Sequence, residues 1–142
     1  MAAAVVVRSR GTFRNEVEAG VHRFVLDEPL AAGGTDEGPT PYDMLASALG
    51  GCTSMTLVFY ARRENLPLEG VDVTVTHDRQ SAKDCVDCTT QKGFIHRFQV
   101  AIRLHGPLLT DEQRHHLLEV AGRCPVKKTL SSEIRIDEVL EA

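Results

Sequence analysis

Tryptophan is absent from this chain of 142 residues, and aromatic residues make up only 5% of it. Basic residues are not in surplus either, since 16 Lys and Arg stand against 20 Asp and Glu, a formal net charge of -4. Nucleic-acid binders need cationic side chains for the phosphates, and single-strand binders also need aromatic rings on which bases stack. The composition therefore argues against a nucleic-acid partner.

Long apolar runs are also missing. The most apolar segment, Met44 to Ala61, is interrupted by Ser and Thr residues, and no segment reaches the ~20 consecutive apolar residues that cross a bilayer. The chain does not begin with a basic segment followed by an apolar core of signal-peptide length. We therefore expect one domain over residues 1–142, located in the cytoplasm, with no membrane partner.

Hydrophobic periodicity and turn residues predict an α+β fold with antiparallel sheets. The expected elements, in chain order, are a strand at 5–7, a hairpin over 13–26 that turns at Gly20, a loop over 27–39, a helix from Pro41 to about Glu64, strands at 71–77 and 94–104, a helix after a capping box at Thr110 and Gln113, a short helical turn from Cys124, and a strand over 131–139.

The long helix is the central element of this prediction. Thr40 can cap it, with Pro41 at its first position and Asp43 three residues after the cap. Its apolar residues go nearly all the way round, which is typical of a buried helix. Gly50 and Gly51 should each cost about 1 kcal/mol relative to alanine, so we expect the helix to gain something there, such as close approach of another backbone.

The four cysteines are Cys52, Cys85, Cys88 and Cys124. Cys52 follows the glycine pair, and Cys124 precedes Pro125 at a predicted helix start. Both residues can be read as small buried hydrophobic side chains. The alternative for Cys124 is a reactive thiol, because backbone N–H groups at a helix start and nearby cations lower a thiol pKa.

Two segments carry a resemblance to a known family. GPTPYDMLASALGGCTSMTL, from Gly38 to Leu57, resembles the central helix of the OsmC/Ohr proteins (osmotically inducible protein C and organic hydroperoxide resistance proteins). RCPVKKTL, from Arg123 to Leu130, resembles their second cysteine motif. The match to the OsmC-like branch implies antiparallel sheets wrapped around a long central helix. It also implies an intertwined homodimer with active sites at the subunit interface.

The resemblance further implies a peroxiredoxin-like organic hydroperoxide reductase that acts in oxidative-stress defence. Cys52 would be the peroxidatic thiolate, which attacks the O–O bond and becomes a sulfenic acid, and Cys124 would be the resolving thiol. An external dithiol reductant would restore the pair, and no metal, haem or flavin would take part. The alternative function on the same fold is non-enzymatic binding of a small ligand, or redox sensing.

The sequence departs from the family pattern at the residues that hold the thiolate. The family uses an Arg from its N-terminal strands, for which Arg14 is the first candidate here and Arg10 the second. Its helix Glu is replaced by Tyr42, with Asp43 beside it as a substitute carboxylate. Asp43 can equally be a capping residue of the helix. Lys127 stands where the family often has His.

Cys85 and Cys88 form a C-x-x-C unit in a polar loop and are not part of that pattern. Three readings stay open for them. They could be an auxiliary dithiol that reduces the Cys52–Cys124 disulfide. They could be half of a zinc site completed by residues such as His77 and His96, which makes them the weak metal candidates. They could also be an exposed loop pair without a function.

Overall fold

The computed structural model describes residues 4–142. The chain divides into two compact units, residues 1–45 and 46–142, and each is described by itself. In the first unit, β1 (Val5–Ser9), β2 (Asn15–Ala19) and β3 (His22–Leu26) form an antiparallel sheet in the order β1-β2-β3. Val17 lies opposite Val7 and Phe24, and Gly20 turns the β2–β3 hairpin at φ 63°. The predicted strand and hairpin are confirmed.

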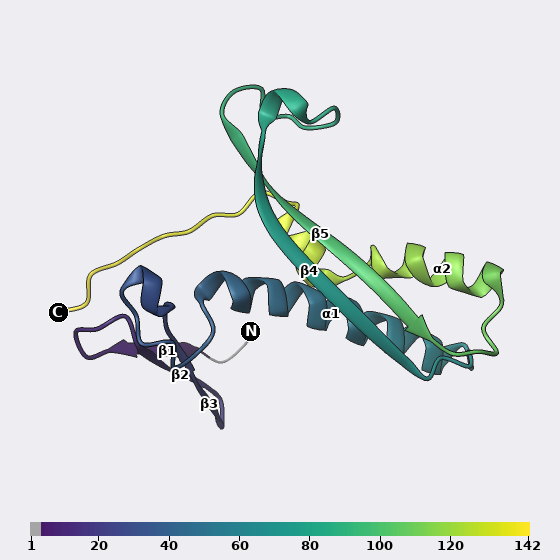
Figure 1. Ribbon diagram of the computed structural model, residues 1–142, viewed down its shortest axis with the longest axis horizontal. Coiled ribbons are helices and arrows are strands. Elements are labelled where there is room, and N and C mark those ends of the chain that lie inside the picture. The colour runs from purple at the N-terminus through teal and green to yellow at the C-terminus, as the bar shows by residue number, and fades with distance from the viewer. Residues whose placement is uncertain (1–3) are drawn as a thin grey trace. The chain divides into compact units, whose positions relative to one another are not determined.

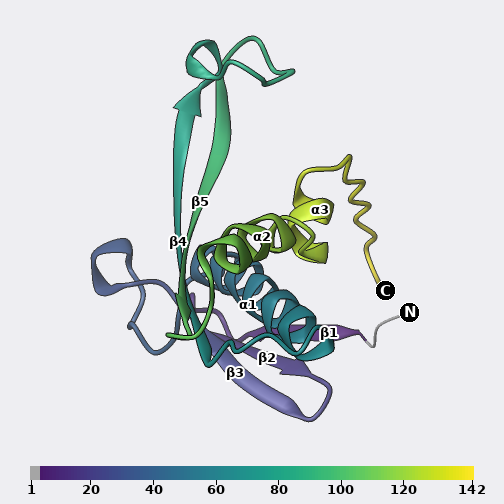
Figure 2. The ribbon, with the colours of Figure 1, turned by 90° about the vertical axis from the view of Figure 1, so that its right-hand side faces the viewer.

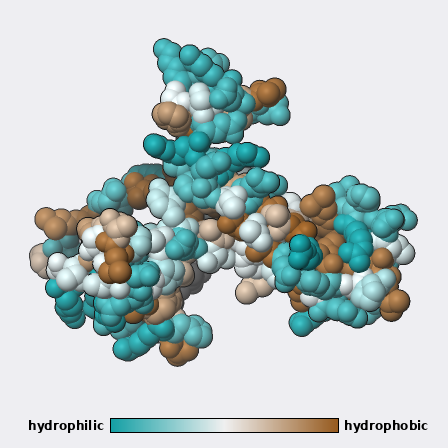
Figure 3. Space-filling model, in the orientation of Figure 1, coloured by the Kyte–Doolittle hydropathy of each residue, from teal (hydrophilic) through white to brown (hydrophobic). Residues whose placement is uncertain are grey.

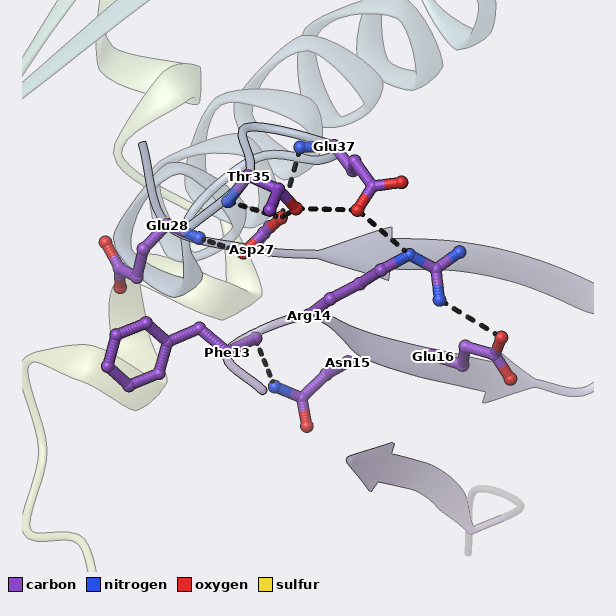
Figure 4. A network of polar contacts seen from close by, with 8 residues as sticks. All are labelled: Phe13, Arg14, Asn15, Glu16, Asp27, Glu28, Thr35 and Glu37. Atoms are coloured by element: carbon purple, nitrogen blue, oxygen red, sulfur yellow. Dashed lines mark hydrogen bonds and ion pairs between the residues drawn. The ribbon is translucent and has the colours of Figure 1, made fainter. Parts of the chain in front are cut away.

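The loop after β3 is organised around the carboxylate of Asp27. This side chain is only 2% exposed. It accepts hydrogen bonds from the N–H groups of Glu28, Thr35 and Glu37 and from the Thr35 hydroxyl. These bonds hold down the pKa of Asp27, chiefly the one from Thr35, against the opposing effect of burial. Buried polar groups fix a loop when their hydrogen bonds are satisfied in this way. Figure 4 shows the network.

The long helix α1 runs from Pro41 to Arg63, so both its existence and its limits are confirmed. Its N-terminus is closed by reciprocal hydrogen bonds. The Thr40 N–H donates to the Asp43 carboxylate at 3.0 Å, and the Asp43 N–H donates to the Thr40 hydroxyl at 3.1 Å. This is a capping box built with Asp in the position usually held by Glu. The helix ends before Asn65, which has φ 53°.

The second unit pairs a long hairpin with helices. β4 (Gly70–Ser81) and β5 (Phe94–His105) are antiparallel, with Val75 opposite Val100. α2 (Asp111–Ala121) begins at the predicted Thr110–Gln113 capping box, and α3 (Pro125–Leu130) is the predicted helical turn. Leu57 of α1, Leu109, and Leu117, Val120 and Ala121 of α2 form the buried core of this unit. Figure 2 shows α2 beside α1, with the hairpin projecting beyond both.

The glycine pair of α1 works differently from the prediction. A Cβ on Gly50 would lie 3.1 Å from a methyl carbon of Val75 and 3.7 Å from one of Val73. The close neighbour is therefore a row of β4 side chains rather than another backbone. Gly51 has nothing within 4 Å of where its Cβ would be. The helix tolerates Gly50 because a side chain there would hold α1 away from the hairpin.

Two predictions about apolar segments are wrong. The strand expected over 131–139 does not form, and residues 131–142, all of them described, carry neither helix nor strand and are exposed. An extended segment needs the hydrogen bonds of a neighbouring strand, and no strand within residues 4–142 pairs with it. The all-round burial of α1 also fails, because Met55 is 74% and Phe59 67% exposed.

By length and composition alone, α1 could cross a membrane. The core helix of a water-soluble protein passes the same test, and α1 contributes Leu49, Thr53, Leu57 and Ala61 to the buried interior of its unit. We therefore treat α1 as a core helix of the fold.

Candidate functional site: a cysteine pair behind an apolar pocket

Cys52 and Cys124 come together in the second unit, as the sequence predicted. Cys52 lies in the middle of α1, and Cys124 is the residue that precedes α3. Their sulfur atoms are within hydrogen-bonding reach of each other, and both cysteines are free thiols. The Val126 N–H, at the open start of α3, reaches both sulfurs. Two residues that are 72 positions apart in sequence therefore share one site.

A pocket of about 630 Å³ gives access to only one of the two thiols. Cys52 is half-buried and lies in the pocket wall, whereas Cys124 is completely buried. The pocket is lined by residues of α1, by Arg123 and by the first residue of α3, most of them apolar: Ser47, Ala48, Gly51, Cys52, Met55, Thr56, Phe59, Arg123 and Pro125. A small molecule with an apolar body can thus reach Cys52, and Cys124 stands behind it.

The pKa values of the two thiols are shifted in opposite directions. Burial raises the pKa of Cys52, and its hydrogen bond to Cys124 raises it further. Burial also acts to raise the pKa of Cys124, but hydrogen bonds from Cys52, from the N–H groups of Lys127 and Val126 and from the Thr53 hydroxyl outweigh it, so that this pKa lies below its ordinary value. Hydrogen bonds to the charged form of a group favour that form. Of the two thiols, Cys124 therefore loses its proton more readily, and the Cys52 thiol is placed to donate a hydrogen bond to it.

Sequence reasoning did not find two hydroxyl groups that touch this pair. Thr53 is buried beside Cys124, and Thr56 is half-buried beside Cys52. Each hydroxyl also bonds the carbonyl four residues earlier on α1, Thr53 that of Leu49 and Thr56 that of Cys52, both at 2.8 Å. The available signal was spacing on the helix: Thr56 lies four residues after Cys52 and three after Thr53, and residues three or four apart share a helix face.

Arg14, the predicted cation, belongs to the first unit. Its guanidinium contacts Glu16 at 3.2 Å and Glu37 at 3.5 Å. The Nε atom of Arg14 is buried, and its contact with Glu37 lacks hydrogen-bond geometry. Glu37 also accepts from Thr35, so that Arg14 is joined to the Asp27 loop (Figure 4). Glu37, which was not predicted from the sequence, is thus a carboxylate in contact with Arg14. Arg10 lies just after β1 and is exposed.

Asp43, the predicted substitute carboxylate, caps α1 through Thr40. The capping reading of this residue thus has a structural basis, and its role in catalysis stays a prediction. Tyr42 is 57% exposed in the first turn of α1.

Cys85 and Cys88 lie in the connection between β4 and β5 and form a disulfide. Within residues 4–142, no group of three or more His, Cys, Asp or Glu side chains is arranged to hold a metal ion. His77 and His96 do meet, with ring nitrogens 2.9 Å apart, but on the strands rather than beside the cysteines. The zinc reading of the loop therefore has no ligand set in the described residues.

The profile of the family described as OsmC-like protein matches residues 34–139, about three quarters of the chain. The chain belongs to the OsmC-like family. The matched range includes both cysteines of the pair and all the residues that line the pocket beside Cys52.

OsmC-like proteins of known structure share this fold. The OsmC-like protein from Mycoplasma pneumoniae is 19% identical, with 89% of this chain and 85% of that chain covered at a TM-score of 0.70. The organic hydroperoxide resistance protein OhrB of Bacillus subtilis is 23% identical, with 92% and 91% covered at 0.54. An OsmC-like protein of unknown function from Vibrio cholerae is 11% identical, with 94% and 96% covered at 0.66.

At these identities the likeness shows the fold alone, and OsmC-like proteins include one whose function is unknown. No match was found among functionally curated proteins. The activity of this OsmC-like protein must therefore be argued from its own residues.

Proposed function

We propose that this protein is a thiol-dependent peroxidase that reduces organic hydroperoxides, or hydrogen peroxide, through Cys52 and Cys124. The observation that carries the proposal is that the two sulfur atoms differ in their access to the pocket. Cys52 faces an apolar pocket, and Cys124 lies buried behind it and can accept a hydrogen bond from the Cys52 thiol. A nucleophile beside a proton acceptor, with a second thiol in reach, is the arrangement that such chemistry needs.

The reaction follows from this geometry. As Cys52 attacks the outer peroxide oxygen, its proton passes to the Cys124 thiolate and the O–O bond breaks. The Cys52 sulfur becomes a sulfenic acid, and the leaving alkoxide takes a proton from solvent to give the alcohol. The Cys124 thiol then attacks the sulfenic sulfur and water leaves, which forms the Cys52–Cys124 disulfide. An external dithiol returns two electrons and two protons, so that the proposed cycle needs no metal or organic cofactor.

We also propose that Arg14 and Asp43 help to hold the Cys52 thiolate as it forms, as the family resemblance implies. Arg14 has a buried Nε without a hydrogen bond, and Glu16 and Glu37 orient its guanidinium. A guanidinium near a thiolate would stabilise the charge that appears on Cys52 during attack.

The proposed assembly is a homodimer in the cytoplasm. Met55 and Phe59 are large apolar side chains on α1 that one protomer leaves exposed. Side chains of this kind in a row on a long helix are typical of a surface that a second chain covers. The name of the Bacillus subtilis protein, organic hydroperoxide resistance, supports oxidative-stress defence as the role.

The test is peroxide consumption by matched variants. Cys52→Ser should abolish turnover, because the accessible nucleophile is gone. Cys124→Ser should permit about one turnover at most and then stall, because no thiol resolves the sulfenic acid. Arg14→Gln should slow attack, with Arg10→Gln as its control. Equal peroxide consumption by Cys52→Ser and the wild type would overturn the proposal and leave ligand binding in the pocket as the function.

A further inference from the structure

The connection between β4 and β5 carries a second sulfur pair that the proposed peroxidase chemistry does not use. Cys85 and Cys88 lie between a single 3-10 turn, Ala82–Asp84, and the start of β5. Figure 1 shows this connection, which we call the hairpin tip (residues 82–93), at the far end of the hairpin from α2. Figure 3 shows mostly hydrophilic surface over this end. Cys85 and Cys88 are half-buried, and Val86 between them is 95% exposed, so a partner in solution can reach the disulfide.

The disulfide is not needed to close the hairpin. Ser81 is paired with Phe94, and the Ala82 N–H donates to the Gly93 carbonyl at 2.9 Å, so that the β ladder already joins the two strands at the base of the tip. A crosslink between residues three apart also removes little conformational freedom from the unfolded chain. A bond with so small a structural effect points to a chemical use.

We propose that the hairpin tip is a dithiol–disulfide relay that passes electrons to the Cys52–Cys124 disulfide of a second copy of this chain. This inference rests on the proposed peroxidase cycle. An external protein dithiol reduces the Cys85–Cys88 disulfide to two thiols. One of these thiols attacks the Cys52–Cys124 disulfide to give a mixed disulfide, which the other thiol resolves. Two electrons and two protons move at each exchange, and the tip returns to its disulfide.

The reach of the hairpin indicates that the acceptor is another copy. Val75 lies against Gly50, two residues from Cys52. The strand then continues for six residues to Ser81, about 20 Å further at the rise of an extended strand. A stiff two-stranded ribbon cannot fold back over that length, so the tip of one chain serves the site of the next.

The tip and the mouth of the pocket are complementary in chemistry. Val86, between the two cysteines, is 95% exposed, and the pocket beside Cys52 is lined by apolar side chains such as Met55 and Phe59. A Val side chain can enter a pocket of about 630 Å³. If Val86 enters this pocket, the sulfur atoms of the cysteines on either side of it come close to Cys52.

Charge favours the same contact. Asp84 and Asp87 directly precede the two cysteines and are exposed. The three exposed cations near the pocket are Arg123 at its wall and Lys127 and Lys128 on α3. Lys83 and Lys92 also belong to the tip, but neither is next to a cysteine. Asp84 and Asp87 would thus lie near these cations when the sulfur atoms of the tip approach those of the Cys52–Cys124 pair.

The test uses two variants that each keep one sulfur pair. Cys52→Ser/Cys124→Ser keeps only the tip, and Cys85→Ser/Cys88→Ser keeps only the site pair. They are co-expressed so that mixed assemblies form, reduced, and treated with one equivalent of cumene hydroperoxide per site pair. Alkylation and mass spectrometry then locate the disulfide with time. We expect it to form in the site-pair chain and then to appear in the tip chain, and the tip chain alone should stay reduced over that time.

A disulfide that persists in the site-pair chain while the tip thiols stay reduced would overturn the relay but not the peroxidase. If the peroxide leaves the site pair reduced, the peroxidase proposal fails instead. The thiol oxidant diamide is then used to form the Cys52–Cys124 disulfide, so that transfer to the tip can still be measured. Transfer in the wild type but not in the mixture would overturn the role of the second copy.

Two further variants test the contact itself. Asp84→Asn/Asp87→Asn should slow transfer roughly tenfold at low salt, the scale expected when complementary charges steer an encounter. Lys83→Gln/Lys92→Gln is the matched control and should not slow it. If the two double variants transferred the disulfide at equal rates, the charges of the two Asp residues would not contribute to the contact.

Discussion

The hydroxyls of Thr53 and Thr56 allow a direct determination of which sulfur carries the negative charge. Thr53 bonds Cys124 and Thr56 bonds Cys52. Both also bond a helix carbonyl at 2.8 Å. A hydroxyl has one proton, so it can donate to the carbonyl while accepting from a thiol, or turn and donate to a thiolate. Replacing either Thr by Val keeps the shape and removes the hydroxyl.

The expected size of the effect follows from the thiolate that loses its donor. A hydrogen bond to a charged group contributes about 1.5–3 kcal/mol, and one pKa unit corresponds to about 1.4 kcal/mol. Because the lost carbonyl bond offsets part of this, Thr53→Val should raise the pKa of the reactive thiolate by about one unit. Thr56→Val should raise it much less, since Thr56 contacts Cys52, whose pKa is raised, rather than Cys124. Thr53→Ser keeps a hydroxyl and should restore most of the shift.

The assay is the pH dependence of thiolate absorbance and of alkylation rate, in a Cys85→Ser/Cys88→Ser background so that only the site pair titrates. The direction of the pH dependence follows from the lowered pKa of Cys124. The thiolate is present above that pKa, which lies below the ordinary 9.0, and is lost as the pH falls through it. A larger rise with Thr56→Val than with Thr53→Val would refute the reasoning and place the charge on Cys52.

Three further predictions test other parts of the structure. Leu117→Ala should lower the free energy of unfolding by about 2–5 kcal/mol, because Leu117 is fully buried, whereas its exposed neighbour Leu118 should tolerate Ala within about 0.5 kcal/mol; denaturant titration measures both, and equal losses would contradict the core assignment. Asp27→Asn should destabilise the protein at neutral pH and not in acid, since the lowered pKa of Asp27 stabilises the fold above 3.8 and this is lost as the pH falls through the folded-state value; Glu28→Gln is the control, and a loss unchanged in acid would count against the loop carboxylate. Ala48→Lys, which adds a charge to the pocket, should raise KM for cumene hydroperoxide more than for hydrogen peroxide in steady-state kinetics, and an equal rise for both would argue against apolar substrate binding there.

Local sequence signals were sufficient for most of the fold. The capping residues Thr40 and Thr110, the turn at Gly20 and the alternation of Val71, Val73 and Val75 each fix a structure through neighbouring residues. The strand lengths were less accurate, because β4 continues beyond His77 through polar residues to Ser81. What extends it is the ladder with β5, which is invisible in one segment alone.

The candidate site was predictable where its residues lie in motifs. Cys52 and Cys124 could be paired through the family resemblance, and the structure brings them together. The protonation of the pair could not be predicted, since it depends on the Val126 N–H and the Thr53 hydroxyl reaching the sulfurs across the fold. Glu37 was missed because it lies in a loop without periodicity, and only the Asp27 network places it beside Arg14.

The two wrong predictions point to one physical cause. The alternation of Ile134 and Ile136 with charged residues is typical of a half-buried strand, yet both Ile side chains are more than half exposed and no strand pairs with them. Met55 and Phe59 are likewise apolar on the side of α1 that the core of its unit leaves uncovered. A hydrophobic periodicity reflects which side chains are buried in the functional assembly of a protein. That assembly includes any partner chain. In the proposed homodimer the second copy would supply both the strand edge and the cover for α1. On this reasoning Met55→Glu should lower the fraction of dimer in sedimentation, and a dimer unchanged by this substitution would place the interface elsewhere.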